Sequence, residues 1–216
     1  MNRNKIILDL CGGTGAWSEP YRKAGYDVRV ITLPEFDVTQ TQFGTDGAIY
    51  FYSPKGKGVM DGITNVHGIL AAPPCTMFSI ARTTAKTPPD FETAMKVVEA
   101  CLKIVWFARS KGNLKWWALE NPTGYLRQFL GNPPMWFYQW EFGGKFYKRT
   151  DIWGYYNQPK GRVRRRPKYN KKSLASAWSH PPIPDDLKGL GISAARAAVR
   201  AITPPGFAKS FFKANP

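Results

Sequence analysis

One stretch near the N-terminus restricts the fold of this 216-residue chain more than any other part. Residues 5–10, KIILDL, form a continuous apolar run, which is typical of a strand buried on both faces. The glycine-rich turn CGGTGAWS follows, and then come a helix predicted over 19–26 and a second β-branched run over 27–33. A strand, a glycine loop, a helix and a strand within about 30 residues form a βαβ unit, which requires a parallel sheet.

The rest of the chain continues this alternation. Strands are predicted over 67–73 and 115–121, and a helix capped by Asp90 is predicted over 91–110. Residues 34–66 are expected to form loops with a short element or two. Two further β-like runs lie around 137–142 and 151–157. Near the end, AARAAVRAI, capped by Ser193, and GFAKSFFKAN are expected to be helical. The pattern predicts an α/β fold with a mostly parallel sheet and helices on both faces.

Length and cysteine content exclude several classes of protein. The length fits one domain with a core of its own. Cys11, Cys75 and Cys101 are odd in number and widely spaced, which argues against a disulfide framework. With only His67 and His180 and no Cys-x-x-Cys pair, no metal site is expected. The sequence contains neither a signal peptide nor a membrane-length apolar run, so we expect a soluble protein of a reducing compartment.

The positive charge is concentrated in one segment. The net charge is +16, and residues 145–172 hold 11 Lys/Arg against one acid, interleaved with Phe, Tyr and Trp. Basic residues between aromatic ones suit a nucleic acid, with cations on the phosphates and rings near the bases. A solvated loop that aids solubility is the alternative. The residues expected to contact nucleic acid are Lys148, Arg162, Arg164, Arg165, Arg166 and Lys168.

Three motifs directly follow predicted strands, so they should face one crevice at the carboxyl ends of the sheet. The first is the glycine loop over 11–15, whose glycines allow the backbone to approach a ligand closely. It lacks the Gly-Lys-Ser/Thr of a P-loop, and the next strand does not end in the acid expected for a dinucleotide. The missing acid makes a dinucleotide less favoured and leaves other adenosine ligands open.

The other two motifs carry a thiol and a carboxylate. Prolines 73 and 74 fix the position of Cys75, which is either a nucleophile or a small core residue. Glu120 ends an apolar strand, so we expect partial burial to raise its pKa. The alternative for Glu120 is a helix cap or an ion-pair partner of the basic segment.

Taken in this order, DLCGGTGAWS, PPCTMFS and ENP resemble the C5-cytosine methyltransferases. ENPTGYL with KRTDIWG is similar to a short branch of that family, often encoded by phages, with a reduced target-recognition region. The resemblance covers about residues 5–154 and the TPPGFAKSFF end. It implies a Rossmann-like class I methyltransferase fold with a catalytic domain over 1–157. It also implies a basic nucleic-acid-binding segment over 158–192 and a C-terminal helical segment over 193–216 that packs back beside the cofactor.

The resemblance also implies roles for individual residues. Cys75 would be the thiolate that adds to cytosine C6, Glu120 the partner of ring N3, and Arg149 the first of two arginines near the cytosine carbonyl. DNA would be the substrate, in the cytoplasm of a bacterium or a phage-infected host cell. The cofactor would be S-adenosylmethionine, and the residues implied to bind it are Asp9, Cys11, Gly12, Gly13, Thr14, Gly15, Trp17, Asp37 and Pro74.

The chain departs from the family at three points. Asp151 occupies the place of the second arginine, which leaves Arg149 or Lys148 for the carbonyl. No acid matches the usual ribose ligand, for which Thr32 and Glu35 are the candidates. Only about 50 residues separate Gly154 from TPPG, and they offer phosphate-binding cations but few base-reading groups. We therefore expect relaxed sequence specificity and binding that weakens steeply with salt.

Several alternatives stay open at this stage. One is the same chemistry on RNA such as tRNA, and another is a non-catalytic relative that binds nucleic acid. Methylation of an amino group is disfavoured, because Ala72 precedes the prolines where an acid, Asn or Ser is expected and Cys75 follows them where an aromatic residue is expected. A cysteine hydrolase would need a histidine partner. His67 begins the strand that ends at Cys75 and so should lie at its far end, whereas His180 is not excluded.

Overall fold

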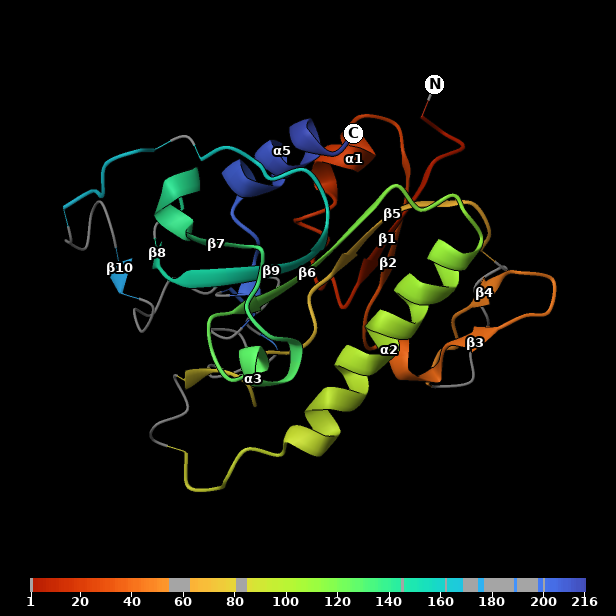
Figure 1. Cartoon of the computed structure of the whole chain (residues 1–216), viewed down its shortest axis with the longest axis horizontal. Coiled ribbons are helices and arrows are strands. Elements are labelled where there is room, and N and C mark those ends of the chain that lie inside the picture. Colours follow the sequence, from red (N-terminus) through yellow and green to blue (C-terminus); the bar gives the residue numbers. More distant parts are fainter. Residues whose placement is uncertain are drawn as a thin grey trace.

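The computed structural model describes residues 2–54, 63–80, 85–144, 146–161, 163–168, 175–176, 189, 198–199 and 201–216. Its centre is a six-stranded sheet in the order β2-β1-β5-β6-β9-β7 (Figure 1). The first four strands are parallel, and β9 runs antiparallel to both of its neighbours. The strands are β1 (Ile6–Leu10), β2 (Asp27–Ile31), β5 (Val66–Ala71), β6 (Trp116–Pro122), β7 (Met135–Tyr138) and β9 (Arg149–Tyr155). The predicted α/β class with a mostly parallel sheet is confirmed.

Most of the predicted elements are present, with small shifts at their ends. Helix α2 (Phe91–Ser110) begins where predicted, because the carboxylate of Asp90 accepts a hydrogen bond from the Thr93 N–H at 3.0 Å. Helix α1 (Glu19–Lys23) ends before the predicted residue 26, since Gly25 has a left-handed φ of 81°. Helix α5 (Pro205–Ala214) confirms the helix expected near the C-terminus.

One predicted strand is partly wrong. The run over 137–142 is a strand only as far as Tyr138, and Gln139–Phe142 form the 3₁₀ helix η3. The helix begins there because the carboxylate of Glu141 accepts the N–H of Tyr138, and it ends at Gly143, whose φ is 80°. Tertiary burial of these aromatic residues thus overrides their preference for strands.

The remaining short elements lie in the loops. The 34–66 region contains η1 (Val38–Gln40), β3 (Gln42–Phe43) and β4 (Ile49–Tyr50), while α3 (Leu126–Leu130) was not predicted. Strand β8 (Phe146–Tyr147) pairs with β10 (Ala175–Ser176). The helix predicted from AARAAVRAI and its cap Ser193 lie mostly outside the described residues. None of the helices described is both long enough and apolar enough to cross a membrane.

The sheet is covered on both faces, and its strand residues alternate between the two layers. Leu8 and Ile69 pack in a core with α2, whereas Ile7 and Leu70 pack in a second core with α1 and α5. Figure 1 shows α5 beside α1, on the far side of the sheet from α2. The chain end is fixed there, because the hydroxyl of Tyr21 donates to the Asn215 carbonyl oxygen at 2.7 Å.

Candidate active site

The strand order identifies where a ligand should bind. From β1 the chain passes to β2 on one side of the sheet, whereas β5 and β6 lie on the other side. Ligands of open α/β sheets bind outside the carboxyl ends of the strands at such a reversal. The glycine loop follows β1, the Pro-Pro-Cys turn follows β5, and Glu120 lies near the end of β6. All three motifs therefore lie along the same edge of the sheet.

The glycine loop presents its backbone at this edge. Gly13 has a left-handed φ of 54°, and a Cβ at that position would have no atom within 4 Å, so the tip of the loop faces open space. Only glycine fits at position 12, because a Cβ there would lie 2.4 Å from the carboxyl carbon of Asp9. The glycine loop thus packs against Asp9 on one side and exposes its backbone at the tip.

Asp9 is the buried support of the loop. Its side chain is fully buried and accepts a hydrogen bond from the Ser18 hydroxyl at 2.6 Å. Burial raises the pKa of Asp9 to about 6, although the Ser18 hydrogen bond and the charge of Arg22 oppose the rise. Its Oδ1 atom has no hydrogen-bond partner among the described protein atoms. Such a buried acceptor is suited to a polar ligand group.

The other residues predicted to bind a cofactor lie at different depths. Cys11 and Thr14 lie in the loop and Pro74 is exposed after β5, so all three reach the ligand edge. The Oδ1 atom of Asp37 caps η1 by accepting the Thr39 N–H at 2.9 Å, one strand further out than the glycine loop. Trp17 differs, since it is only 2% exposed.

Trp17 lies beneath the loop and not on its ligand surface. Its ring contacts Phe207 at 5.8 Å and Phe211 at 5.4 Å between centroids, both from α5. The indole thus anchors the loop to the C-terminal helix, and the structure assigns it a supporting place.

Cys75 begins a short helical turn directly after β5. Its carbonyl oxygen accepts the N–H groups of Phe78 at 3.0 Å and Ser79 at 2.9 Å. The thiol residue is half-buried, and all three cysteines lie within the described parts of the chain without forming a disulfide. Buried Pro73 on one side and fully buried Phe78 on the other hold the turn in place. The backbone around Cys75 is therefore fixed at both ends.

The end of β6 clamps this turn. Asn121, which is fully buried, donates its side-chain amide to the Pro73 carbonyl oxygen at 2.9 Å. The Tyr125 N–H donates to the Phe78 carbonyl oxygen at 2.8 Å. A Cβ at Gly124 would lie 2.1 Å from that same oxygen, so only glycine fits. Sequence analysis singled out neither Asn121 nor Gly124 as a site residue, although both stand in the quoted ENPTG motif.

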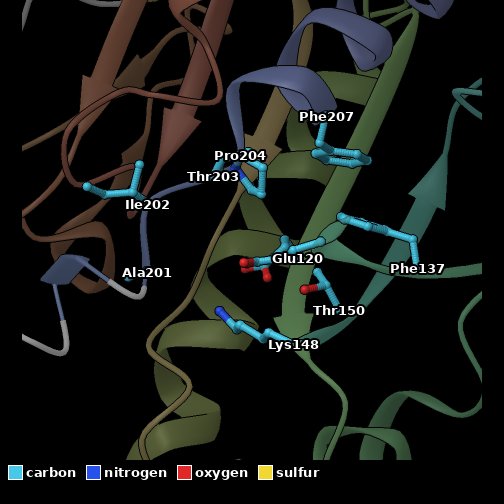
Figure 2. A pocket seen from close by; sticks show the side chains of 10 residues that line it. Glu120, Phe137, Lys148, Thr150, Ala201, Ile202, Thr203, Pro204 and Phe207 are labelled. Carbon is cyan, nitrogen blue, oxygen red and sulfur yellow. The ribbon is translucent and has the colours of Figure 1, made fainter. Parts of the chain in front are cut away.

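Glu120 faces a small hollow between the sheet and the segment that leads into α5 (Figure 2). Burial raises the pKa of Glu120, the Asp151 carboxylate raises it further, and the Lys148 ammonium opposes the rise. Figure 2 shows the side chains of Glu120, Lys148 and Thr150 directed into the same space. The lining residues are Glu120, Phe137, Gln139, Lys148, Thr150, Ala201, Ile202, Thr203, Pro204 and Phe207.

Arg149 does not share this space, which corrects its predicted role beside the cytosine. Strand residues alternate in direction, and Glu120 is paired with Ile152, two residues beyond Thr150. Arg149 points to the opposite face, where its Nε donates to the Thr123 hydroxyl at 3.0 Å. A one-residue shift of the motif along a strand exchanges the two faces. The side chains beside Glu120 are therefore those of Lys148 and Thr150.

Asp151, on the face of Arg149, is part of the framework. It is fully buried and accepts two hydrogen bonds from the Arg127 guanidinium, at 2.6 and 2.7 Å. The Thr123 hydroxyl donates a third at 2.6 Å. The Asp151 carboxylate thus fixes the loop after β6.

The described part of the basic segment lies next to these strands. The Val163 N–H donates to the Glu141 carbonyl oxygen at 3.0 Å, which anchors the segment to η3. Arg162 lies outside the described residues. The exposed cations that follow are Arg164, Arg165, Arg166 and Lys168.

Comparison with known protein families and with curated proteins finds no match to this chain. In the described part of the chain, no group of three or more His, Cys, Asp or Glu residues could hold a metal ion.

Proposed function

We propose that this protein transfers a methyl group from S-adenosylmethionine to C5 of cytosine in DNA, on a Rossmann-like methyltransferase fold. The resemblance of the three motifs suggests this chemistry. The observation that carries the proposal is the clamp between the Cys75 turn and the end of β6, with the Asn121–Pro73 hydrogen bond at its centre. It joins two motifs that lie 45 or more positions apart in the sequence. One follows β5, which is next to β1 and its glycine loop, and the other ends β6, the next strand along.

The glycine loop fits the proposed cofactor. An open backbone tip, a buried acceptor atom on Asp9 and an exposed proline beside the loop suit a nucleoside with an amino-acid tail. The residues that would hold it are Cys11 to Gly15, Asp37 and Pro74. When bound, S-adenosylmethionine supplies an electrophilic methyl group on a sulfonium.

The chain's own residues make C5 reactive toward that methyl group. C5 of cytosine is a weak nucleophile. The thiolate of Cys75 adds to C6, so an S–C6 bond forms and the electron pair of the C5–C6 double bond becomes available at C5. Glu120, whose raised pKa favours its protonated form, donates a hydrogen bond or proton at N3. The Lys148 ammonium, next to Glu120, is placed to contact the base carbonyl.

The same residues complete the reaction. Once C5 carries the methyl group, it loses its proton to solvent, the electron pair re-forms the C5–C6 double bond, the S–C6 bond breaks and the Cys75 thiolate is released. The proton that Glu120 holds at N3 returns to the carboxylate. In a duplex the target base would first have to leave the stack.

Labelled methyl transfer to duplex DNA, single-stranded DNA and tRNA tests the proposal. We expect label at cytosine C5, and a loss on the order of 10⁴-fold or more in Cys75→Ser, as when other nucleophiles are removed. Cys101→Ala is the matched control. Its buried thiol on α2 contacts Cys11 of the glycine loop, so the control is measured at saturating cofactor, where transfer should stay intact. DNA containing 5-fluorocytosine, which has no C5 proton to lose, should trap a covalent adduct with the wild type only. Transfer that survives in Cys75→Ser, or label on tRNA alone, would contradict the proposal.

A further inference from the structure

Strands β7 and β8 carry a run of contacting aromatic rings on the side of the sheet to which Arg149 points. We define the aromatic ladder as Trp136, Tyr138 and Tyr147. Trp136 meets Tyr138 edge-on at 5.9 Å, and Tyr138 stacks on Tyr147 at 4.6 Å with 22° between the planes. Trp136 is 50% exposed, on a strand at the edge of the sheet.

An arginine lies over each end of the ladder. The Arg149 guanidinium is 4.7 Å from the centre of the Trp136 ring, and that of Arg166 is 4.4 Å from the Tyr147 ring. Arg149 is also held by the Thr123 hydroxyl, which in turn donates to the buried Asp151. The rings and cations are thus fixed before any ligand arrives.

This arrangement differs from the other exposed tryptophan–arginine pair in the described part of the chain. Trp106 on α2 is 68% exposed, and Arg109 lies 6.0 Å from its ring. No other aromatic ring contacts Trp106 among the described residues. Arg109 also lies 5.9 Å from the Tyr155 ring, so two rings share one cation there. The ladder instead has three contacting rings between two cations.

We propose that the aromatic ladder, with Arg149 and Arg166, binds unpaired bases of single-stranded DNA; this rests on the proposed function in taking DNA as the substrate. Aromatic rings between cations bind single strands because each base can stack on a ring while a cation meets the phosphates. In a duplex the faces of the bases are already stacked on one another, so only edges and phosphates are accessible.

The position of the ladder suits nucleotides that flank the target base. Lys148 and Arg149 are consecutive, one beside Glu120 and the other over Trp136. Strand β7 is the outermost strand of the sheet, so a single strand with one base at the hollow can pass around this edge to the ladder. The exposed cations of the basic segment continue from Arg166.

Fluorescence anisotropy with labelled (dT)20, (U)20 and a 20-base-pair duplex, without cofactor, tests this. We expect Trp136→Ala to weaken (dT)20 binding by about 5- to 100-fold, the effect of losing one base stack, and to leave duplex binding unchanged. Trp136→Phe, which keeps a ring, should recover most of the affinity. Trp106→Ala is the matched control and should change neither.

Three results would overturn the proposal: no loss in Trp136→Ala, an equal loss on duplex, or the same loss in Trp106→Ala. A loss confined to (U)20 would overturn the assignment to DNA. The binding assay needs neither cofactor nor thiol, so Cys75→Ser should keep the single-strand preference. Failure of methyl transfer would therefore leave this test intact, and any of the three results above would overturn the ladder while leaving the methyl transfer in place.

Discussion

The two faces of the sheet at strands β6 and β9 each hold a carboxylate, and the two carboxylates lie in opposite electrostatic environments. On one face, Glu120 lies in a small hollow, and burial raises its pKa despite the nearby Lys148. On the other face, Asp151 is fully buried but accepts three hydrogen bonds, two of them from one guanidinium. One carboxylate is held in an environment that favours its neutral form, and the other is matched as an anion.

The difference separates reactivity from support. A group whose pKa is raised by desolvation is suited to hold or give a proton near neutral pH. A carboxylate paired on all sides is suited to fix the backbone and its neighbours, here Thr123 and through it Arg149. The hollow is thus the reactive face of β9, and the face with the aromatic ladder is the preorganised one.

The largest expected effect on stability comes from breaking the supporting face. Asp151→Ala should lower the free energy of unfolding by about 3 kcal/mol, because it leaves the Arg127 guanidinium without its partner. We place the loss at the low end of the usual range because the Arg127 side chain is 25% exposed and can reach water. Urea denaturation measures it.

Asp27→Ala is the matched control for that measurement. Asp27 pairs with Arg29 at 2.9 Å, but both side chains are about a third exposed, so its loss should cost under about 1 kcal/mol. Asp151→Ala should also weaken binding of (dT)20, since Arg149 loses the support of Thr123. Equal losses of stability in the two variants would show that the two faces do not differ in this way.

The next effect comes from the reactive face. Glu120→Gln should slow single-turnover methyl transfer by roughly 10²- to 10³-fold, because the amide cannot supply a proton at N3. The raised pKa of Glu120 determines the direction in which the rate of methyl transfer changes with pH. Protonated Glu120 persists to higher pH than an ordinary glutamate, and the rate should fall as the pH rises through its pKa.

The pH profile of the variant provides the check. In Glu120→Gln this high-pH fall should disappear, because glutamine does not titrate. If the fall in rate at high pH persisted unchanged in Glu120→Gln, a group other than Glu120 would be responsible for it.

Much of the fold could be predicted because its signals are local. The apolar run of β1, the glycine turn and the Asp90 cap each depend on a few neighbouring residues, and the structure confirms the elements they define. The order of the motifs along strands also sufficed to bring the glycine loop, Cys75 and Glu120 to one edge of the sheet.

The features that sequence analysis missed depend on distant partners or on register. Trp17 was expected on the ligand side of its loop, but α5, some 190 positions later, buries it. Asn121 gains its role only once it meets Pro73. The motif KRTD left both Arg149 and Lys148 open as partners of the cytosine carbonyl, because it does not reveal which residues of an antiparallel strand lie on the side of Glu120.

The last prediction tests the register of β9 against β6 by replacing each of two neighbouring cations, Lys148 and Arg149, with methionine. At saturating DNA, Lys148→Met should slow methyl transfer by about 10-fold, since it removes a charged hydrogen-bond donor beside Glu120. Arg149→Met should leave this rate unchanged and should weaken binding of (dT)20 by removing the cation over Trp136. Measuring the rate at saturation separates the two effects, because weaker binding then no longer limits transfer. If Arg149→Met slowed the saturated rate and Lys148→Met did not, Arg149 would be the residue beside the base and the two faces of β9 would have to be exchanged.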